Sequence, residues 1–126
     1  FDAISRDGDY LGGAIAPGLR LSADALFFAT SQLRRVELVR PRSAISKNTV
    51  NAMQSGLIFG YAGLVEEMVR RFKSELGGEA CVIGTGGLVK LIAAETNVLE
   101  VVAPDLTLRG LYYIYELNYG PSGNGG

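Results

Sequence analysis

The stretch NTVNAMQSGLIFGYAGLVEEMVRRFKSEL, residues 48–76, decides how the rest of the chain is organised. Its large apolar side chains recur at steps of three or four residues, which is the period of an α-helix. They are Val50, Met53, Leu57, Tyr61, Leu64, Met68 and Phe72. No proline interrupts the stretch, and Gly77-Gly78 follows it as a C-cap signal. The pattern predicts one helix over residues 48–76, about 40 Å long at ~1.5 Å per residue.

The first half of this helix, residues 50–65, carries no charged side chain, and charges return only at Glu66. A helix that is apolar on all sides must be buried on all sides. Asn51, Gln54 and Ser55 interrupt the apolar run, which is already shorter than the ~20 residues of a membrane span. We therefore expect burial within protein and no membrane insertion.

Three glycines, Gly56, Gly60 and Gly63, lie inside the same half. Each costs roughly 1 kcal/mol relative to alanine in a helix, and the close approach of another backbone would offset that cost. We expect the helix of residues 48–76 to pack on its own domain on one side and on a second subunit on the other. The alternative is the central helix of a monomer.

Composition narrows the functional classes. The chain has 126 residues, enough for one domain with a core, and its net charge of −1 gives no support for binding nucleic acid or anionic membranes. It has no histidine, which excludes a Ser-His or Cys-His nucleophile pair and leaves no typical zinc ligand set. Its one cysteine, Cys81, is expected as a buried thiol. The lack of a disulfide framework fits a reducing, cytoplasmic compartment.

The other segments predict an α/β chain. We expect strands at residues 1–5, 10–16, 80–83 and 98–102, and a further strand at 33–39, where Leu33, Val36 and Leu38 alternate with other residues. Helices are expected at 19–30, 88–95 and 106–118, with Ser22 as the N-cap of the regular part of the first. Asp7-Gly8 predicts a hairpin turn, and Gly12-Gly13 a bulge or a close backbone approach. The order predicts a mixed sheet with an N-terminal hairpin and later parallel crossovers.

The sharpest candidate for a binding site is Gly84-Thr85-Gly86-Gly87. A strand that ends in glycines and opens a helix presents free backbone N–H groups, which favour a phosphate or let a flat ligand approach. A tight strand-to-helix turn explains the same pattern. It is neither a P-loop nor the dinucleotide pattern G-x-G-x-x-G.

A second candidate is Lys47-Asn48-Thr49, at the start of the long helix. Ser46 or Asn48 can simply cap the helix. The functional alternative is that the helix N-terminus and the Thr49 hydroxyl receive an anionic or polar group of a ligand.

Other residues carry weaker signals. A basic group on loops contains Arg34, Arg35, Arg40, Arg42 and Lys47, and such a run is more often a solvated face than a phosphate contact. No pair of carboxylates has a spacing that suggests acid–base catalysis, and Asp2 is the one nearest the hairpin glycines. We expect the tyrosines of the last helix to pack it; they are Tyr112, Tyr113 and Tyr115.

Several segments together resemble one family, the type III pantothenate kinases. They are residues 10–18 (YLGGAIAPG), 25–26, 33–38 (LRRVEL), 47–56 (KNTVNAMQSG), 84–88 (GTGGL), 105–111 (DLTLRGL) and 114–118 (IYELN). They span nearly the whole chain in the family's order. The family's first half, with its Asp-x-Gly start and Gly-x-Asp-Arg stretch, has no counterpart here. Its Asp-Phe-Gly-Thr-Ala-Thr-Thr motif would stand directly before Phe1. The chain therefore resembles the second half alone, with a half-domain at 1–118 and a flexible tail at 119–126.

The resemblance implies a ribonuclease-H-like, actin-like ATPase half-domain. It implies phosphorylation of pantothenate to 4′-phosphopantothenate, the first step towards coenzyme A, with ATP, Mg²⁺ and a monovalent cation, K⁺ or NH₄⁺. Thr49 matches the family's pantothenate contact, and Gly84, Gly86 and Gly87 match the turn on the nucleotide side of the cleft. Thr85 is given no role, and no catalytic or metal-binding residue is expected in this chain.

The resemblance also implies partners. It implies a homodimer formed through the helix of residues 48–76, and a missing N-terminal half that carries the catalytic residues. Without that half, we expect the chain to be inactive. Two alternatives remain: a non-catalytic dimerising or interaction half-domain, and another kinase of the actin-like superfamily.

Overall fold

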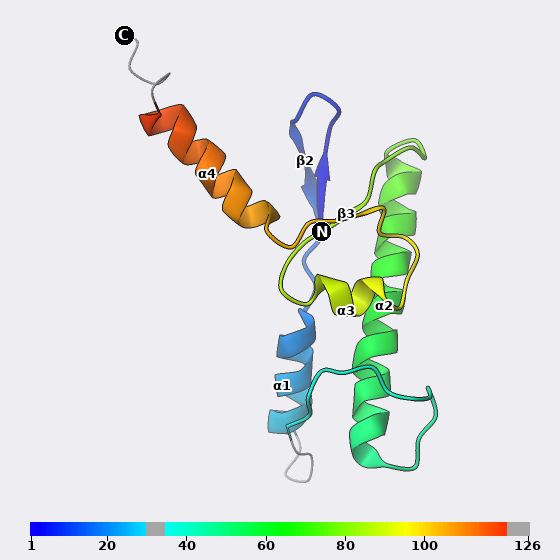
Figure 1. Ribbon diagram of the computed structural model, residues 1–126. Helices are drawn as coiled ribbons and strands as arrows, with labels where there is room; N and C mark the ends of the chain where they lie inside the picture. The colour runs from blue at the N-terminus through cyan, green and yellow to red at the C-terminus, as the bar shows by residue number, and fades with distance from the viewer. Residues whose placement is uncertain (30–34, 121–126) are drawn as a thin grey trace. The chain divides into compact units, whose positions relative to one another are not determined.

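The computed structural model describes residues 1–29 and 35–120 of the chain (Figure 1). These residues divide into two compact units, Phe1–Ala80 and a second one that begins at Cys81. The described part of each unit combines helix with a two-stranded sheet, which confirms the predicted α/β composition. Within the described ranges, no helix has the length and apolar character that crossing a bilayer requires.

The first unit starts with the predicted hairpin, formed by β1 (Asp2–Ile4) and β2 (Tyr10–Gly13). The strands are antiparallel, with Asp2 opposite Gly13, and the register shifts between Ala3 and Ile4. Gly12 lies at this irregularity with φ +130°, and a Cβ on Gly13 would overlap the carbonyl oxygen of Phe1. Both predicted reasons for the glycine pair, a bulge and a close backbone approach, are therefore confirmed. The strands are shorter than predicted.

Helix α1 (Leu19–Ala29) follows Pro17-Gly18, and Leu19 is buried. The prediction that Ser22 caps this helix is wrong. The Ser22 N–H donates to the Gly18 carbonyl oxygen at 2.9 Å, so Ser22 already lies in the first hydrogen-bonded turn. The helix starts directly after Pro17-Gly18, three residues before Ser22.

The predicted strand at residues 33–39 is not formed in its described part, residues 35–39, and residues 33 and 34 lie outside the described range. Val36 and Leu38 are half-buried between exposed neighbours, so the predicted alternation is present. A strand needs a partner for its backbone groups, and residues 35–39 pair with no strand among the described ones. Residues 35–39 instead belong to an irregular segment that precedes the next helix.

That helix, α2 (Thr49–Glu75), is the predicted long helix, and Gly77 and Gly78 end it with φ of +87° and +98°. The Gly78 N–H donates to the Lys73 carbonyl oxygen at 2.7 Å, as in a glycine C-cap. The buried apolar residues of α2, together with Leu19, form the core of the first unit, and Val89 and Ile92 are buried in the second. In α2 they are Met53, Leu57, Ile58, Ala62 and Val65.

The burial of α2 is one-sided within the described chain. Ile58 is fully buried, whereas Gly56, Gly60 and Gly63 are exposed. A Cβ built on any of these glycines would meet no atom within 4 Å. Helix α1 lies alongside the first half of α2 (Figure 1). At the other end of α2, the rings of Phe1 and Phe72 are 6.4 Å apart, so the hairpin lies near the last turns of α2.

The second unit contains a short parallel ladder between β3 (Ile83–Gly84) and β4 (Val101–Val102), with α3 (Val89–Ala93) between them in sequence. Helix α4 (Leu106–Tyr119) follows. Within the described part of this unit, the predicted order of strand, helix, strand and helix is confirmed, but both strands are only two residues long. Residues 121–126, most of the predicted tail, lie outside the described range.

Two further predictions fail here. The hairpin and the β3–β4 pair are separate two-stranded sheets among the described residues, so the single mixed sheet is not formed there. Cys81 is exposed and not buried, because it precedes the two-residue β3 instead of lying within a covered strand.

Candidate functional site

The start of α2 is a capped helix N-terminus with an exposed hydroxyl beside it. Asn48 has extended backbone angles, and its Oδ1 accepts a hydrogen bond from the Asn51 N–H at 3.1 Å. The Asn48 N–H in turn donates to the Ser46 Oγ at 3.1 Å. The structural explanation of this motif is therefore confirmed. Thr49 is the first residue of the 27-residue helix and is exposed, so its hydroxyl is accessible at the positive end of the helix dipole.

Two buried polar side chains of α2 hold the segment that leads to this start, residues 35–48, which we call the approach segment. The Gln54 Nε2 donates to the Glu37 carbonyl oxygen at 2.9 Å, and the Ser55 Oγ donates to the Ala44 carbonyl oxygen at 2.6 Å. The sequence interpretation used these two residues only as an argument against a membrane span. Uncharged polar residues inside an otherwise apolar half-helix were the signal that could have pointed to this role.

The basic group divides into two kinds of residue. The Arg35 guanidinium lies 5.1 Å from the centre of the Phe27 ring, and the Arg40 guanidinium 5.9 Å from the Phe59 ring. Both are within the range of a cation–π contact. Arg42 and Lys47 are exposed, and Arg34 lies outside the described residues. Arg35 and Arg40 of this basic group thus pack their guanidinium groups onto aromatic rings.

The glycine turn after β3 contains glycines with different structural reasons. A Cβ on Gly84 would lie 2.7 Å from the Val89 Cγ2 and 3.0 Å from the Leu99 Cδ1, so packing within the second unit requires a glycine there. Gly86 has φ +99°, a left-handed conformation that favours glycine. Neither reason applies to Gly87, because its φ is not left-handed and a Cβ built on it would meet no described atom within 4 Å. The tight-turn interpretation thus accounts for Gly84 and Gly86, and Gly87 has no structural explanation in the described chain.

The helix after this turn, α3, has only five residues, and its capping position, Leu88, has no side-chain cap. Its macrodipole is correspondingly limited, and the turn itself presents the exposed backbone of Gly86 and Gly87. Thr49 belongs to the first unit and the glycine turn to the second. They are two separate candidate sites, each described within its own unit.

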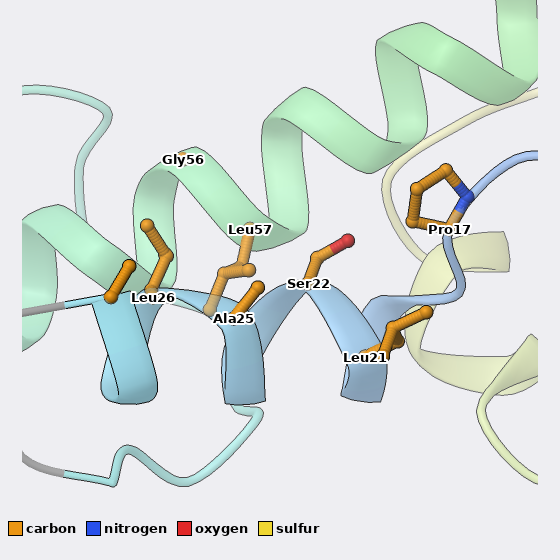
Figure 2. A pocket seen from close by; sticks show the side chains of 8 residues that line it. Pro17, Leu21, Ser22, Ala25, Leu26, Gly56 and Leu57 are labelled. Atoms are coloured by element: carbon orange, nitrogen blue, oxygen red, sulfur yellow. The ribbon is translucent and has the colours of Figure 1, made fainter.

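An apolar groove of about 620 Å³ lies between α1 and α2 (Figure 2). Its lining residues are Pro17, Leu21, Ser22, Ala25, Leu26, Ala29, Gly56 and Leu57. Among the described residues, no titratable side chain lines this groove, and Thr49 does not line it. The groove is therefore suited to contact with apolar side chains and not to acid–base chemistry.

The carboxylates with shifted pKa values are surface ion pairs. Hydrogen bonds from Arg70 and then Arg71 lower the pKa of Glu67 from 4.5 to about 2. A hydrogen bond from Arg109, at 2.8 Å, similarly lowers the pKa of Asp105. All of these side chains are exposed and lie within single helices. Asp2 is exposed in β1, so none of these groups has the buried setting of a catalytic acid or base.

A site for Mg²⁺ needs several oxygen ligands at one place. Within residues 1–29 and 35–120, no three His, Cys, Asp or Glu residues are grouped so that they could hold a metal ion. A Mg²⁺ site held by three such side chains is therefore not formed by the described residues.

The tyrosines of α4 are not packed in the way the sequence suggested. No residue of α4 is buried, and Tyr112, Tyr113 and Tyr115 are between 58% and 64% exposed. Rings contact each other along the helix instead, with Tyr115 and Tyr119 centred 5.6 Å apart. The prediction of packing fails in the described chain because no other element covers this helix.

Comparison with known proteins gives one consistent family. The sequence model of the family described as "Type III pantothenate kinase" matches residues 1–71. A type III pantothenate kinase of Roseiflexus sp. is 59% identical over 118 residues, and one of Dehalococcoides mccartyi is 53% identical over the same length. A third, from Moorella thermoacetica, is also 53% identical.

These matches cover nearly all of this chain but only part of each relative. Each match takes in 94% of this chain but only 45% or 46% of the relative, in the C-terminal part of the relative. The chain thus spans less than half the length of the curated relatives it matches. The similarity nevertheless extends over both units, and the family model covers more than half of the residues. The chain belongs to the type III pantothenate kinase family.

Proposed function

We propose that this chain forms part of an enzyme that transfers the γ-phosphoryl group of ATP to the primary hydroxyl of pantothenate, giving 4′-phosphopantothenate, the first step of coenzyme A biosynthesis. The observation that carries the proposal is the 59% identity to a type III pantothenate kinase over 118 residues. Identity at this level along both units supports a shared activity more strongly than any single motif in the chain.

Thr49 and the glycine turn have different roles in this proposal. The exposed Thr49 hydroxyl, at the N-terminus of α2, contacts pantothenate, whose carboxylate suits the positive end of a helix dipole. The exposed backbone of Gly86 and Gly87 forms a wall of the nucleotide cleft, and Gly84 shapes the turn that presents it. Phosphoryl transfer depends mainly on positioning and charge neutralisation, so contacts of this kind are sufficient as this chain's contribution.

The catalytic residues and phosphate loops belong, in this proposal, to an N-terminal half that the relatives have and this chain does not match. Such a half would complete a ribonuclease-H-like, actin-like kinase fold. The apolar surface of α4 supports the proposal, because a helix with no buried residue exposes large side chains on every side. Among them are Leu108, Leu111, Ile114 and Leu117, each at least 58% exposed. The chain alone is expected to be inactive.

The proposed enzyme uses Mg²⁺ bound to the phosphates of ATP and a monovalent cation, K⁺ or NH₄⁺. Their protein ligands would come from the N-terminal half. Within this chain, the residues that serve the reaction are those that bind and orient the substrates.

A homodimer is the proposed assembly. The glycines Gly56, Gly60 and Gly63 are exposed, and a Cβ built on any of them would meet no atom of the described residues within 4 Å. The apolar groove between α1 and α2 includes one of these glycines, Gly56 (Figure 2). A second copy packed on this surface would offset the cost of glycines within a helix.

The test is a completed kinase, in which the part of the Roseiflexus protein that precedes the match is joined to Phe1 of this chain. The completed kinase should phosphorylate pantothenate with ATP. Thr49→Ala should raise the KM for pantothenate about tenfold, the scale of one hydrogen bond to a charged group, and leave the KM for ATP unchanged. Thr49→Ser, which keeps the hydroxyl, is the matched control and should stay close to the wild type.

Three other results would point elsewhere. A completed kinase that phosphorylates a different alcohol would indicate another kinase of the actin-like superfamily. A folded, dimeric protein with no phosphoryl transfer would indicate a non-catalytic interaction half-domain. Turnover by the isolated chain would contradict the assignment of the catalytic residues to the N-terminal half.

A further inference from the structure

We propose that Ser55 and Gln54 are positioning residues for pantothenate, because they hold the approach segment and thereby fix the corner at Lys47-Asn48-Thr49. This inference rests on the proposed function and assigns it two residues that do not themselves touch the substrate. Its basis is the pair of hydrogen bonds from α2 to the backbone of the approach segment, at the Glu37 and Ala44 carbonyl oxygens.

The burial of the two side chains makes these contacts specific. Gln54 and Ser55 are each only 7% exposed, although they lie among apolar neighbours in the uncharged half of α2. A serine inside a helix commonly bonds to a carbonyl of its own preceding turn. Ser55 instead donates out of the helix to Ala44, eleven residues earlier. Buried polar groups need partners, so both side chains are committed to the approach segment.

The Ser55 contact closes a short ring of chain around the corner. From Ala44, the chain runs through Ser46 and Asn48 into α2 and returns to Ser55 after less than two helical turns. Inside this ring, Ser46 and Asn48 make the capping hydrogen bonds. The corner is therefore held from the helix side by the cap and from the loop side by Ser55.

The Gln54 contact holds the same segment further upstream. It fixes Glu37, and Arg40, between the two anchored carbonyls, lies over the Phe59 ring on α2. Pro41 is buried in the same stretch. With both anchors in place, the approach segment has little freedom to shift, and Lys47 and Thr49 keep one arrangement towards a bound anion. Loss of either anchor would leave the Thr49 hydroxyl present but less often in its binding position.

The experiment uses the completed kinase with Ser55→Ala and, separately, Gln54→Met, which removes the amide donor while keeping a side chain of similar length. Alanine and methionine are good helix formers, so neither change weakens α2 through helix propensity. Ser55→Thr retains the hydroxyl as a rescue variant. Ser74→Ala, at an exposed serine near the other end of α2, is the matched control. Steady-state kinetics with both substrates and amide hydrogen exchange of residues 37–48 are measured for each.

The expected result is a KM for pantothenate raised roughly 3- to 10-fold, the range set by one hydrogen bond, with the KM for ATP and kcat unchanged. Exchange in residues 37–48 should be faster in both variants and unchanged in Ser74→Ala, and Ser55→Thr should restore both values. Faster exchange with an unchanged pantothenate KM would overturn the inference. A lower kcat together with equally raised KM values for pantothenate and ATP would overturn it as well. A wild-type completed kinase without activity would overturn the proposed function, and this inference with it.

Discussion

Gly84 lies so close to Val89 that a Cβ added to the glycine would stand 2.7 Å from the Val89 Cγ2. The Gly84→Ala variant must therefore push Val89 or Leu99 away, and overpacking of this kind costs about 1–3 kcal/mol. We expect a clearly lower midpoint in thermal unfolding of the completed kinase. Unchanged stability would show that the turn can relax, and would remove the packing explanation for this glycine.

Gly87→Ala is the matched variant in the same turn. A Cβ on Gly87 meets nothing within 4 Å, and its φ is not left-handed, so stability should stay close to that of the wild type. If the exposed backbone of Gly87 borders the nucleotide, the added methyl group should raise the KM for ATP severalfold and leave the KM for pantothenate unchanged. Equal ATP kinetics in Gly87→Ala and the wild type would count against a nucleotide contact at this residue.

Asn48 offers a way to separate capping from anion binding. Its Oδ1 accepts the Asn51 N–H, so Asn48→Ala should lower the unfolding free energy by about 1 kcal/mol. Asn48→Asp keeps an equally good cap but places a negative charge beside Thr49. If an anionic group of pantothenate binds there, Asn48→Asp should retain stability yet raise the KM for pantothenate. A pantothenate KM that Asn48→Asp leaves unchanged would place the carboxylate of the substrate elsewhere.

The sequence was most informative where local signals decide the structure. The apolar period and the two glycines predicted α2 to within one residue at each end, and Asp7-Gly8 predicted the hairpin. It was least informative where structure depends on a partner. Residues 35–39 alternate as a strand should but pair with no strand among the described residues. The tyrosines of α4 and the thiol of Cys81 are exposed for a related reason, because no described element covers them.

The same contrast between local signals and tertiary contacts holds for the candidate site residues. Thr49 and the glycine turn could be selected from sequence because capping residues and glycines have strong local preferences. Which glycine serves packing could not be predicted, because Leu99, which a Cβ on Gly84 would meet, is distant from it in sequence. The anchors from Gln54 and Ser55 to the approach segment are likewise tertiary contacts, whose partners are backbone carbonyls that no side-chain pattern marks.

The ion pairs of α2 predict a measurable titration. The Arg70 Nε and Nη2 each donate to a Glu67 carboxylate oxygen at 2.7 Å, and the Arg71 Nε adds a third bond. The pKa of Glu67 is lowered to about 2 from 4.5, so its stabilising contribution is complete above pH 4.5 and is lost as the pH falls through about 2. NMR titration of the Glu67 carboxyl carbon should give that midpoint.

Arg70→Gln removes the largest cause of this shift and should raise the Glu67 midpoint towards 4.5. Arg109→Gln, which removes a cation from another helix, is the control and should leave the Glu67 titration unchanged. A wild-type midpoint already near 4.5 would mean that the two arginines do not hold the carboxylate in solution.

The exposed glycines of α2 lead to the prediction about assembly. A Cβ on Gly60 meets no atom of the described residues within 4 Å, so Gly60→Leu should be accommodated by the protomer and should even improve helix propensity. If a second copy packs closely against this surface, however, a leucine side chain has no room there. We therefore expect Gly60→Leu to convert a dimeric completed kinase to monomers, as measured by native mass spectrometry. Ser74→Leu places the same side chain at an exposed position near the end of α2 and should remain dimeric. A Gly60→Leu protein with the dimer mass of the wild type would mean that the interface lies elsewhere, and the cost of the three glycines would then need another explanation.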